Sequence, residues 1–335
     1  MTNLLPDNMN LSFLNLPNLR NMKKLIFLFI TLLGFYNCST PSKFDQKKVR
    51  NQISLGETES ILVTLASDEM KGRDSNSGGY FKAAEFVTSY FKQHGVEPFY
   101  PSFRDSLITK DVDSYNIVGR IGAYNPKLKT VLIGAHLDHV GVKETEGDSV
   151  YNGANDNAAG ATAVIQIARF LANHQWEKNI IVALFADEEK GLKGAYHLAE
   201  RLKKEGVSLE YMINFEMIGT VLTSGENQVY LTGYKRSTMA DEMNKISPQF
   251  VQFLPQAKEL NLFKRSDNYA FYEIFGIPAQ TLSSFDFKNF DFYHKAGDEV
   301  DKLNIENMNQ IIGTSAFTLA KLFQSNATLV LFQNE

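Results

Sequence analysis

The stretch from Thr130 to Gly160, TVLIGAHLDHVGVKETEGDSVYNGANDNAAG, decides the fold class. Its first residues, TVLIGA, form a continuous apolar run, which is typical of a strand buried on both faces of a parallel sheet. The run ends abruptly in His136, Asp138 and His139, and Asp156 follows at the start of a helical pattern. Polar residues just past the carboxyl end of such a strand face the usual ligand crevice of an open α/β sheet. Two imidazoles and two carboxylates at this place indicate a metal site.

The order of strand, acidic corner and helix is repeated along the chain. The apolar run NIIVALFADEEKG ends at Glu188 and Glu189, and YMINFEMIG ends at Glu216. Between them, GLKGAYHLAERLKKEG has helical spacing, as does the amphipathic segment that begins at Asp156. This alternation predicts an α/β fold with a mixed, mainly parallel β-sheet and helices on both faces.

Helical spacing also occurs outside the central alternation. It predicts helices over residues 57–72 and 79–95, before the sheet, and a last helix from about Asn304 to Phe323. Between the first two helices, Arg73 lies in a Gly/Ser-rich loop, where we interpret it as a structural clamp more readily than as a solvated charge.

Length and composition restrict the class of protein. With 335 residues, 44% of them hydrophobic and 21% charged, the chain can build a large core and is not a disordered protein. The net charge of -4 and the lack of a basic block with interleaved aromatics argue against a nucleic-acid partner. The single cysteine, Cys38, excludes an intramolecular disulfide and a thiolate metal cluster, which leaves His, Asp and Glu as ligand types.

The beginning of the chain has the pattern of an export signal. Met22, Lys23 and Lys24 precede LIFLFITLLGFYN, an apolar run too short to span a bilayer comfortably, and Cys38 ends it. This resembles a bacterial lipoprotein signal, although FYN departs from the small residues usual before the cysteine, so cleavage without lipidation stays open. We predict an exported periplasmic or outer-membrane or cell-surface lipoprotein, otherwise a secreted protein, that meets the membrane only through an anchor at Cys38.

Residues from several strand ends and loops converge on one predicted edge of the sheet. Because parallel strands end at the same edge, the polar residues after the three runs meet there, and loops beside helices add two more. If one carboxylate bridges two ions, five such ligands are sufficient for a pair of divalent cations, and the lack of cysteine fits zinc. The candidate ligands are His136, Asp156, Glu189, Glu216 and His294.

Five motifs in order, HLDH, GANDNAAG, ADEEKG, NFEMIG and FYHKAGDEVD, resemble those of metallopeptidase family 28, the co-catalytic zinc aminopeptidases. The resemblance covers roughly residues 57–325 and includes LASDEMKGR, NIVGRIG and RSDNYAFYEIFGIPA. Each motif alone is a weak signal, and their common order makes the match specific. The resemblance implies the zinc-aminopeptidase (phosphorylase/hydrolase-like) fold and a hydrolase that acts on peptide bonds.

The resemblance assigns the ligands to two zinc ions. Asp156 would bridge them, with Glu189 and His294 completing one site and His136 and Glu216 the other. Family members usually carry Asp where Glu216 stands, and the extra methylene leaves the occupancy of that second site open.

Two further roles follow from the resemblance. Glu188 would be the general base, which takes a proton from the water between the ions and passes it to the departing amine. Asp138 resembles the carboxylate that orients the imidazole of His136 and raises its basicity.

Other polar residues of the motifs have simpler interpretations. We expect His139, His174 and His197 to be structural or exposed, since no ligand spacing supports them. Asp187 stays open between a helix N-cap and a catalytic group. Asn268 stands where relatives have histidine, which leaves its part in substrate positioning open. The aromatic loop 285–293 either lines a hydrophobic pocket or simply packs.

We therefore predict a zinc-dependent exopeptidase whose substrate is a peptide, most simply an aminopeptidase that releases N-terminal residues. A carboxypeptidase, for which Arg265 is the one nearby arginine, and a glutaminyl cyclase are alternatives on the same fold. A non-catalytic binding or receptor-like module is an alternative of another class. The predicted regions are an upstream extension and signal peptide (1–38), a polar linker (39–56) and a zinc peptidase domain (57–330), with 234–262 a lid or insertion.

Overall fold

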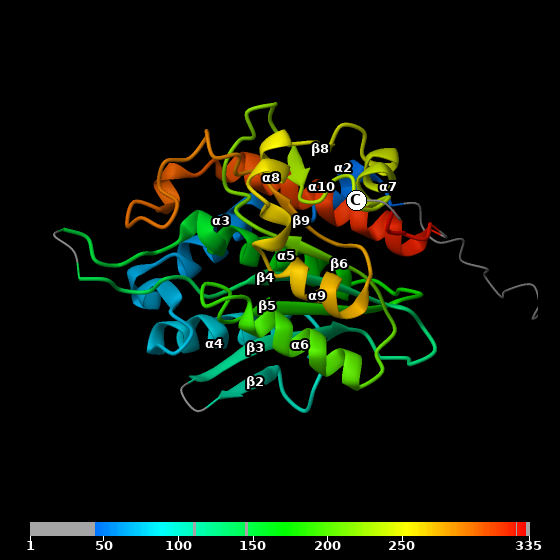
Figure 1. Ribbon diagram of the computed structural model, residues 1–335, viewed down its shortest axis with the longest axis horizontal. Coiled ribbons are helices and arrows are strands. Elements are labelled where there is room, and N and C mark those ends of the chain that lie inside the picture. Colours follow the sequence, from blue (N-terminus) through cyan, green and yellow to red (C-terminus); the bar gives the residue numbers. More distant parts are fainter. Residues whose placement is uncertain (1–43, 110–111, 145–146, 326, 333–335) are drawn as a thin grey trace, which may run out of the picture. The chain divides into compact units, whose positions relative to one another are not determined.

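The computed structural model describes residues 44–109, 112–144, 147–325 and 327–332 (Figure 1). The predicted signal peptide and Cys38 lie outside the described residues. Among the described residues, no helix combines the length and the apolar character that crossing a bilayer requires.

The described chain is built around one mixed β-sheet. The strands are β1 (Val96–Pro98), β2 (Arg104–Thr109), β3 (Val112–Ile121), β4 (Thr130–His136), β5 (Asn179–Phe185), β6 (Leu209–Phe215), β7 (Val229–Leu231), β8 (Val251–Gln252) and β9 (Ala279–Ser283). They lie in the order β1-β3-β5-β4-β6-β9-β7-β8, with β2 beside β3. Strands β5, β4, β6 and β9 are parallel neighbours, whereas β3 and β7 run antiparallel to β5 and β9. The predicted mixed, mainly parallel sheet is confirmed in this central part.

Helices cover both faces of the sheet. The α-helices are α2 (Gln46–Arg50), α3 (Leu55–Leu65), α4 (Gly78–Gln93), α5 (Gly160–Ala172), α6 (Lys193–Lys204), α7 (Met239–Ile246), α8 (Pro255–Glu259), α9 (Asn268–Phe275) and α10 (Ile305–Gln324). Side chains from α3, α4, α5 and α10 share one core cluster, and those from α6 and α9 share another. In Figure 1, α6 and α9 lie in front of the strands.

Alternation along β4 explains why its sequence is apolar throughout. Val131 and Ile133 belong to the core under α5, while Leu132 between them belongs to the core under α6. Successive side chains of a strand point to opposite faces, so a strand covered on both sides needs an apolar residue at every position. The polar residues that follow β4 therefore mark the place where the strand leaves the core.

The predicted helix over 57–72 is wrong in its second half. Helix α3 ends at Leu65, and a separate short turn, η1 (Asp68–Arg73), follows. Gly72 has φ +61°, and a Cβ there would lie 2.5 Å from the carbonyl oxygens of Gly141 and Tyr151. The close approach of these backbones requires glycine at position 72, and its left-handed φ is incompatible with an α-helix that continues to this residue.

The predicted helix start at Asp156 is also wrong. Ala154–Ala159 form an irregular turn, η2, and Asp156 has φ -109° and ψ 90°, outside the helical region. Regular helix begins at Gly160, whose N–H donates to Asn157 Oδ1 over 2.9 Å. Asn157 therefore caps α5, and the turn directs Asp156 away from the helix and toward the end of the sheet.

Residues 44–56, the described part of the predicted polar linker, belong to the folded domain. Val49 and Ile53 are buried, and the ring of Phe44 stacks on Trp176 with centroids 5.5 Å apart. The linker prediction is wrong there, because three apolar side chains in a polar segment are sufficient to dock it.

The predicted lid or insertion, 234–262, lies at the edge of the sheet. It contains α7, β8 and α8, and β8 pairs in parallel with β7. The short turn η3 (Leu262–Lys264) connects this segment to α9. Its description as a lid stays a prediction, as does the division of the rest of the chain into the predicted regions.

Candidate metal centre

The carboxyl ends of three parallel strands bring the candidate ligands to one edge of the sheet. His136 is the last residue of β4, Glu188 and Glu189 follow β5, and Glu216 follows directly on β6. Asp156 comes from the turn before α5. The strand order alone places the other four residues together, since β5, β4 and β6 are neighbours in the sheet.

A first donor group forms around His136. Its Nε2 lies 2.9 Å from Glu216 Oε1 and 3.3 Å from Asp156 Oδ1. Ligand atoms of His136, Glu188 and Glu216 all lie within 4.8 Å of one another. Although Glu216 is longer than the aspartate usual in relatives, it reaches this group and is held there by Ser266 Oγ, which donates to Oε2 over 2.7 Å.

A second donor group forms on the other side of Asp156. His294 Nε2 lies 3.0 Å from Asp156 Oδ2 and 3.1 Å from Glu189 Oε1. Asp156 therefore contributes one carboxylate oxygen to each group, which is the position that a bridging ligand requires. The five predicted ligands come together in the arrangement that the family resemblance implies.

His139 belongs to the second group, so the expectation that it stands apart is wrong. Its Nδ1 lies 3.0 Å from Glu189 Oε1 and 3.7 Å from Asp156 Oδ2, and the side chain is buried. The available signal was the His-x-x-His spacing of His136 and His139 at a strand end.

The donor set fits divalent zinc. It consists of imidazole nitrogens and carboxylate oxygens only, the ligand types that zinc accepts without thiolates. Among the described residues, Asp156 Oδ2 receives no hydrogen bond, although the His294 and His139 nitrogens lie 3.0 and 3.7 Å away. Buried polar atoms are normally hydrogen-bonded, so an oxygen left without a donor beside two imidazoles is explained by a cation.

Burial and crowding of charge shift the pKa values of the site. Burial raises the pKa of Glu188 well above its usual range, with the Glu216 carboxylate adding to the shift and His136 opposing it. Close contact with the Asp156 and Glu189 carboxylates raises the pKa of His294 to about 10. Both shifts follow from the crowding of buried carboxylates around the two imidazoles.

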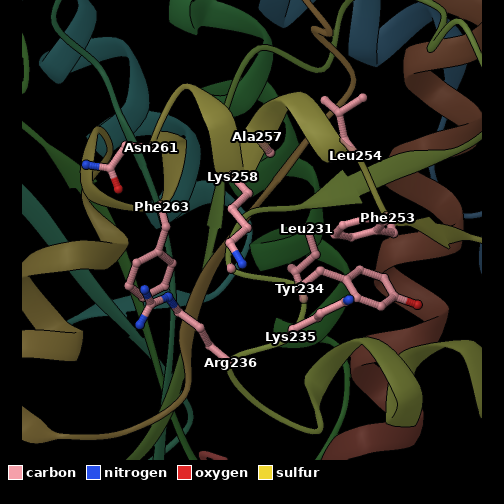
Figure 2. Close-up of a pocket in the computed structure, with 11 residues that line it drawn as sticks. Leu231, Tyr234, Lys235, Arg236, Phe253, Leu254, Ala257, Lys258, Asn261 and Phe263 are labelled. Atoms are coloured by element: carbon pink, nitrogen blue, oxygen red, sulfur yellow. The ribbon is translucent and has the colours of Figure 1, made fainter. Parts of the chain in front are cut away.

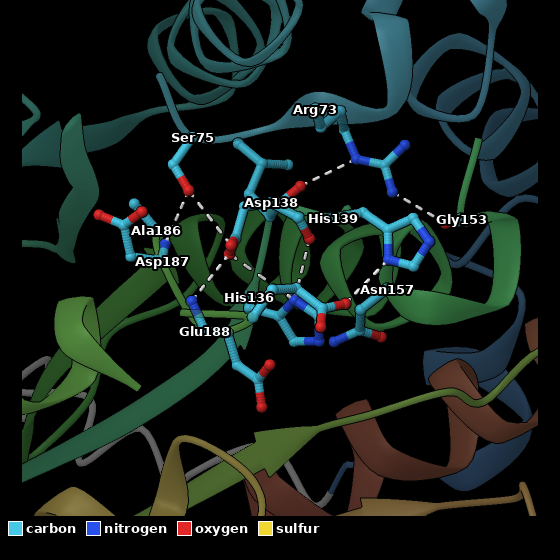
Figure 3. Close-up of polar contacts among 12 residues, drawn as sticks. Arg73, Ser75, His136, Asp138, His139, Gly153, Asn157, Ala186, Asp187 and Glu188 are labelled. Atoms are coloured by element: carbon cyan, nitrogen blue, oxygen red, sulfur yellow. Dashed lines mark hydrogen bonds and ion pairs between the residues drawn. The ribbon is translucent and has the colours of Figure 1, made fainter. Parts of the chain in front are cut away.

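Asp138 fixes the imidazole of His136 through its main chain, not through the carboxylate that the resemblance implies. His136 Nδ1 lies 3.0 Å from the Asp138 carbonyl oxygen and 3.8 Å from Oδ1. The carboxylate instead accepts hydrogen bonds from the Glu188 N–H and from Ser75 Oγ, both over 3.2 Å (Figure 3). Burial raises the pKa of Asp138 to about 7. This carboxylate therefore connects the ends of β4 and β5 and sets the position of Glu188.

Arg73 is a structural clamp behind the metal centre, as we interpret it from the sequence. Its fully buried guanidinium donates to four backbone carbonyls, three of them beside the site, over 2.6 to 2.8 Å. Figure 3 shows the bond to Gly153 among them. Burial lowers the pKa of Arg73 to about 10, and nearby carboxylates, Asp298 first, oppose the shift. The accepting carbonyls are those of Leu65, Leu137, Asn152 and Gly153.

Asp298 was missed by sequence reasoning, although it lies in the last motif. Its two carboxylate oxygens accept from the N–H groups of Asn155 and Asp156 over 2.7 and 3.0 Å. It therefore holds the irregular turn that presents the shared carboxylate. The only sequence feature that marks Asp298 is its place in Gly297-Asp298-Glu299, close after His294. Its role could not be predicted, because the contact forms only when this loop folds back on the turn before α5.

A pocket opens beside the two donor groups. The aromatic loop contributes Phe285, Phe287 and Tyr293 to its wall, and Arg265 contributes a cation. Of the two interpretations of this loop, the structure therefore supports the one in which it lines a pocket. The donor residues that line the same pocket are Asp156, Glu188, Glu216 and His294.

The remaining polar candidates have structural positions. His174 packs against Phe44 and Phe170, and His197 Nε2 lies 3.3 Å from Asp105 Oδ1. Asp187 does not cap α6, since that helix begins at Lys193; its buried carboxylate contacts the Ser114 hydroxyl.

Asn268 is buried and faces the protein interior. Its side-chain amide donates to the carbonyls of Phe263 and Ala279, and its Oδ1 accepts from Thr281 Oγ1 over 2.7 Å. It holds α9 against β9 and is absent from the described lining of the pocket. A structural anchor therefore stands where relatives have histidine.

Comparison with known proteins agrees with this geometry. The sequence model of peptidase family M28 matches residues 116–318, a range that includes every residue of both donor groups. A probable zinc metalloprotease of Pyrenophora teres is 28% identical over 190 residues, which are 51% of this chain and 38% of that protein. The chain thus spans well under half the length of that curated relative.

Solved structures share the fold. The LapA aminopeptidase of Legionella pneumophila superposes with a TM-score of 0.68 at 19% identity, over 84% of this chain and 74% of that one. A glutaminyl cyclase of Porphyromonas gingivalis gives a TM-score of 0.60 at 15% identity, over 80% and 98%. Because these two proteins differ in activity, the likeness to either one shows the fold alone.

Proposed function

Because the chain belongs to peptidase family M28, a family of zinc peptidases, we propose that it is an exopeptidase with two zinc ions that releases N-terminal residues from peptides. The observation that supports two ions is the division of Asp156 between two donor groups, with His136 and Glu216 on one side and Glu189 and His294 on the other. Bound zinc would act as a Lewis acid toward the scissile carbonyl.

The residues that line the pocket suit a substrate with a free N-terminal amine. Glu188 lines the pocket together with the proposed zinc ligands Asp156 and Glu216, so a free substrate amine would lie beside the metals. The aromatic wall of Phe285 and Phe287 suits an apolar first side chain. An aminopeptidase uses both features at once.

Glu188 is the residue we propose as the general acid and base. It lines the pocket, and its N–H is held by Asp138. A carboxylate at this position accepts a proton from the attacking water and returns it to the departing amine. The bond that breaks is the peptide bond, and the proton ends on the new amino group.

A carboxypeptidase is a second candidate, and Arg265 is the observation that favours it. Its guanidinium lines the pocket, and within the described part of the chain it has no carboxylate partner. A substrate carboxylate would supply one. A glutaminyl cyclase, in contrast, would leave the group around His136 without a purpose, since we expect such enzymes to keep a single zinc.

The test compares three substrate types in the zinc-loaded protein. We expect hydrolysis of aminoacyl anilides, little action on N-acetylated dipeptides and no cyclisation of N-terminal glutaminyl peptides. Chelation should abolish hydrolysis and added zinc should restore it. Glu188→Gln should lower kcat by at least about 100-fold, the lower range for a general acid–base residue, while zinc remains bound. Hydrolysis that survives chelation or this substitution would contradict the proposal.

We also propose that the protein is exported and anchored through a lipid on Cys38. The support is the signal pattern at residues 22–38, which lies outside the described residues. Expression in a bacterial host with radiolabelled palmitate should label the membrane fraction in wild type. Cys38→Ser should remove both the label and the membrane association, whereas label that persists would contradict the anchor.

A further inference from the structure

A second pocket, which we call the cationic pocket, lies between β7, the turn after it and α8 (Figure 2). Figure 2 shows Lys258 extending into its centre, between Phe263 on one side and Tyr234 on the other. The lining residues of this pocket include three cations and several aromatic rings. These are Lys235, Arg236, Lys258, Tyr234, Phe253 and Phe263.

The positive charge of the cationic pocket is not balanced by protein carboxylates. Among the described residues, no Asp or Glu lines it, and neither Lys235, Arg236 nor Lys258 forms an ion pair. Arg236 instead stacks over the Phe263 ring at 4.6 Å, and Lys235 lies 5.2 Å from the Phe253 ring. Stacking uses the flat face of the Arg236 guanidinium and leaves its in-plane N–H donors directed elsewhere, and the Lys235 ammonium keeps N–H groups that do not face the ring. Three like charges in one hollow favour an anion.

The part of the cationic pocket's wall between the cations is apolar. Phe253 is 44% exposed, and its ring meets Tyr234 edge to face at 5.6 Å. Leu231, Leu254 and Ala257 complete this surface. An inorganic ion alone would leave the rings in water, so the lining suits an anionic group that is carried on an apolar or aromatic body.

The cationic pocket is separate from the pocket of the metal centre, although both use the same strand. Tyr230 and Thr232 line the pocket of the metal centre, whereas Leu231 and Gly233 line the cationic pocket. Tyr230 and Leu231 are successive residues of β7 and point to opposite faces, and the two pockets have no lining residue in common. A molecule in the cationic pocket is therefore not a substrate in contact with the donor groups.

We propose that the cationic pocket binds a small ligand in which a carboxylate or phosphate is joined to an apolar or aromatic body. The anionic group meets Lys258 and the donors of Lys235 and Arg236, and the body lies against Phe253 and Tyr234. This proposal is independent of the peptidase activity, since it needs neither zinc nor Glu188.

The test uses phenyl phosphate and phenylacetate as anionic probes and 2-phenylethanol as the uncharged analogue, with binding measured by calorimetry on the zinc-loaded protein. We expect an anionic probe to bind at least about tenfold more tightly than the alcohol, which corresponds to about 1.4 kcal/mol. The two anionic probes together distinguish a phosphate ligand from a carboxylate ligand. Equal affinity for all three probes would overturn the proposal.

The double variant Lys235→Gln/Lys258→Gln should bind the preferred probe at least about tenfold more weakly. Lys203→Gln/Lys321→Gln is the matched control, because these lysines also lie over aromatic rings, of Phe275 and Phe317, outside the pocket. Its affinity should be unchanged, and thermal melting checks that both variants fold.

Zinc itself attracts phosphate and carboxylate, so the titrations are repeated after chelation. Binding that persists without zinc and is lost in Lys235→Gln/Lys258→Gln supports the cationic pocket. Binding that disappears with the zinc and ignores the lysines places the probe at the metal centre and overturns the proposal. Loss of peptidase activity in either protein affects neither outcome.

Discussion

His139 Nδ1 lies 3.0 Å from Glu189 Oε1, the same carboxylate oxygen that His294 Nε2 approaches to 3.1 Å. The two imidazoles differ in setting, because the His139 side chain is fully buried and that of His294 is 37% exposed. His139 is thus a fixed partner of Glu189, and His294 closes the group from a loop at the surface. Both imidazoles thus contact the Glu189 carboxylate of the second donor group.

His139→Ala should weaken zinc binding at the second donor group by about 10–100-fold, since Glu189 would lose the group that fixes its orientation. Competition against a chromophoric chelator measures the affinity. His174→Ala is the control, because that imidazole packs among Phe44, Phe170 and Trp176, outside the donor groups. Equal zinc affinity in wild type and His139→Ala would show that His139 only packs.

Glu216→Gln should lower the zinc content from two ions to one per chain, because the group around His136 would lose its charged carboxylate. Atomic absorption after extensive buffer exchange measures the content. Glu210→Gln, which removes a carboxylate paired with Lys178 elsewhere, should keep the wild-type value. Two retained ions in Glu216→Gln would mean that Glu216 is not a ligand.

Arg73→Met should destabilise the fold by about 3 kcal/mol or more, because four buried carbonyls lose their donor and each unsatisfied group costs about 1–3 kcal/mol. Denaturant unfolding measures the change. Arg120→Met is the control, since Arg120 pairs with the exposed Glu97 and such surface pairs contribute about 0–1 kcal/mol. Similar losses in both variants would exclude a clamp.

The buried carboxylate of Asp105 makes the stability of the fold depend on pH. It is buried and accepts hydrogen bonds from Arg201 and Asn116 over 2.7 and 2.9 Å. Burial opposes its ionisation, but hydrogen bonds from His197 and Asn116 outweigh burial and lower its pKa. The folded value therefore lies below the unfolded value of about 3.9, so Asp105 stabilises the fold above that pH and loses this effect as the pH falls through the folded pKa.

Asp105→Asn should accordingly be less stable than wild type at about pH 6, and the difference should shrink toward about pH 3. Urea unfolding at both pH values measures it. Glu97→Gln removes an exposed carboxylate and should show little change at either pH. A constant difference for Asp105→Asn across this range would mean that folding does not lower the pKa of this carboxyl.

The central fold could be predicted because strands covered on both faces must be apolar at every position, as in Val131, Leu132 and Ile133. The wrong predictions concern segments whose structure depends on one or two residues. Gly72 cannot be helical because the backbone approaches Gly141 and Tyr151 there, and Val49 is buried in a segment whose composition is polar. Neither contact has a local signature in the sequence.

The candidate site likewise contains residues that could be predicted from the sequence and residues that could not. His136 and Glu216 follow apolar runs, so strand topology was sufficient to bring them together. His139 depends on how the chain turns after β4, and Asp298 depends on a loop that returns from far along the sequence. The cationic pocket could not be predicted, because its residues come from turns and short helices with no regular spacing.

The position of β7 between the two pockets restricts how this part of the molecule can change in evolution. Odd-numbered residues 231 and 233 face one hollow and even-numbered residues 230 and 232 face the other. A slip of one residue against β9 would exchange the two sets and direct Leu231 toward the candidate metal ligands. Insertions beside this strand are therefore tolerated only when they preserve its pairing register, whatever their length.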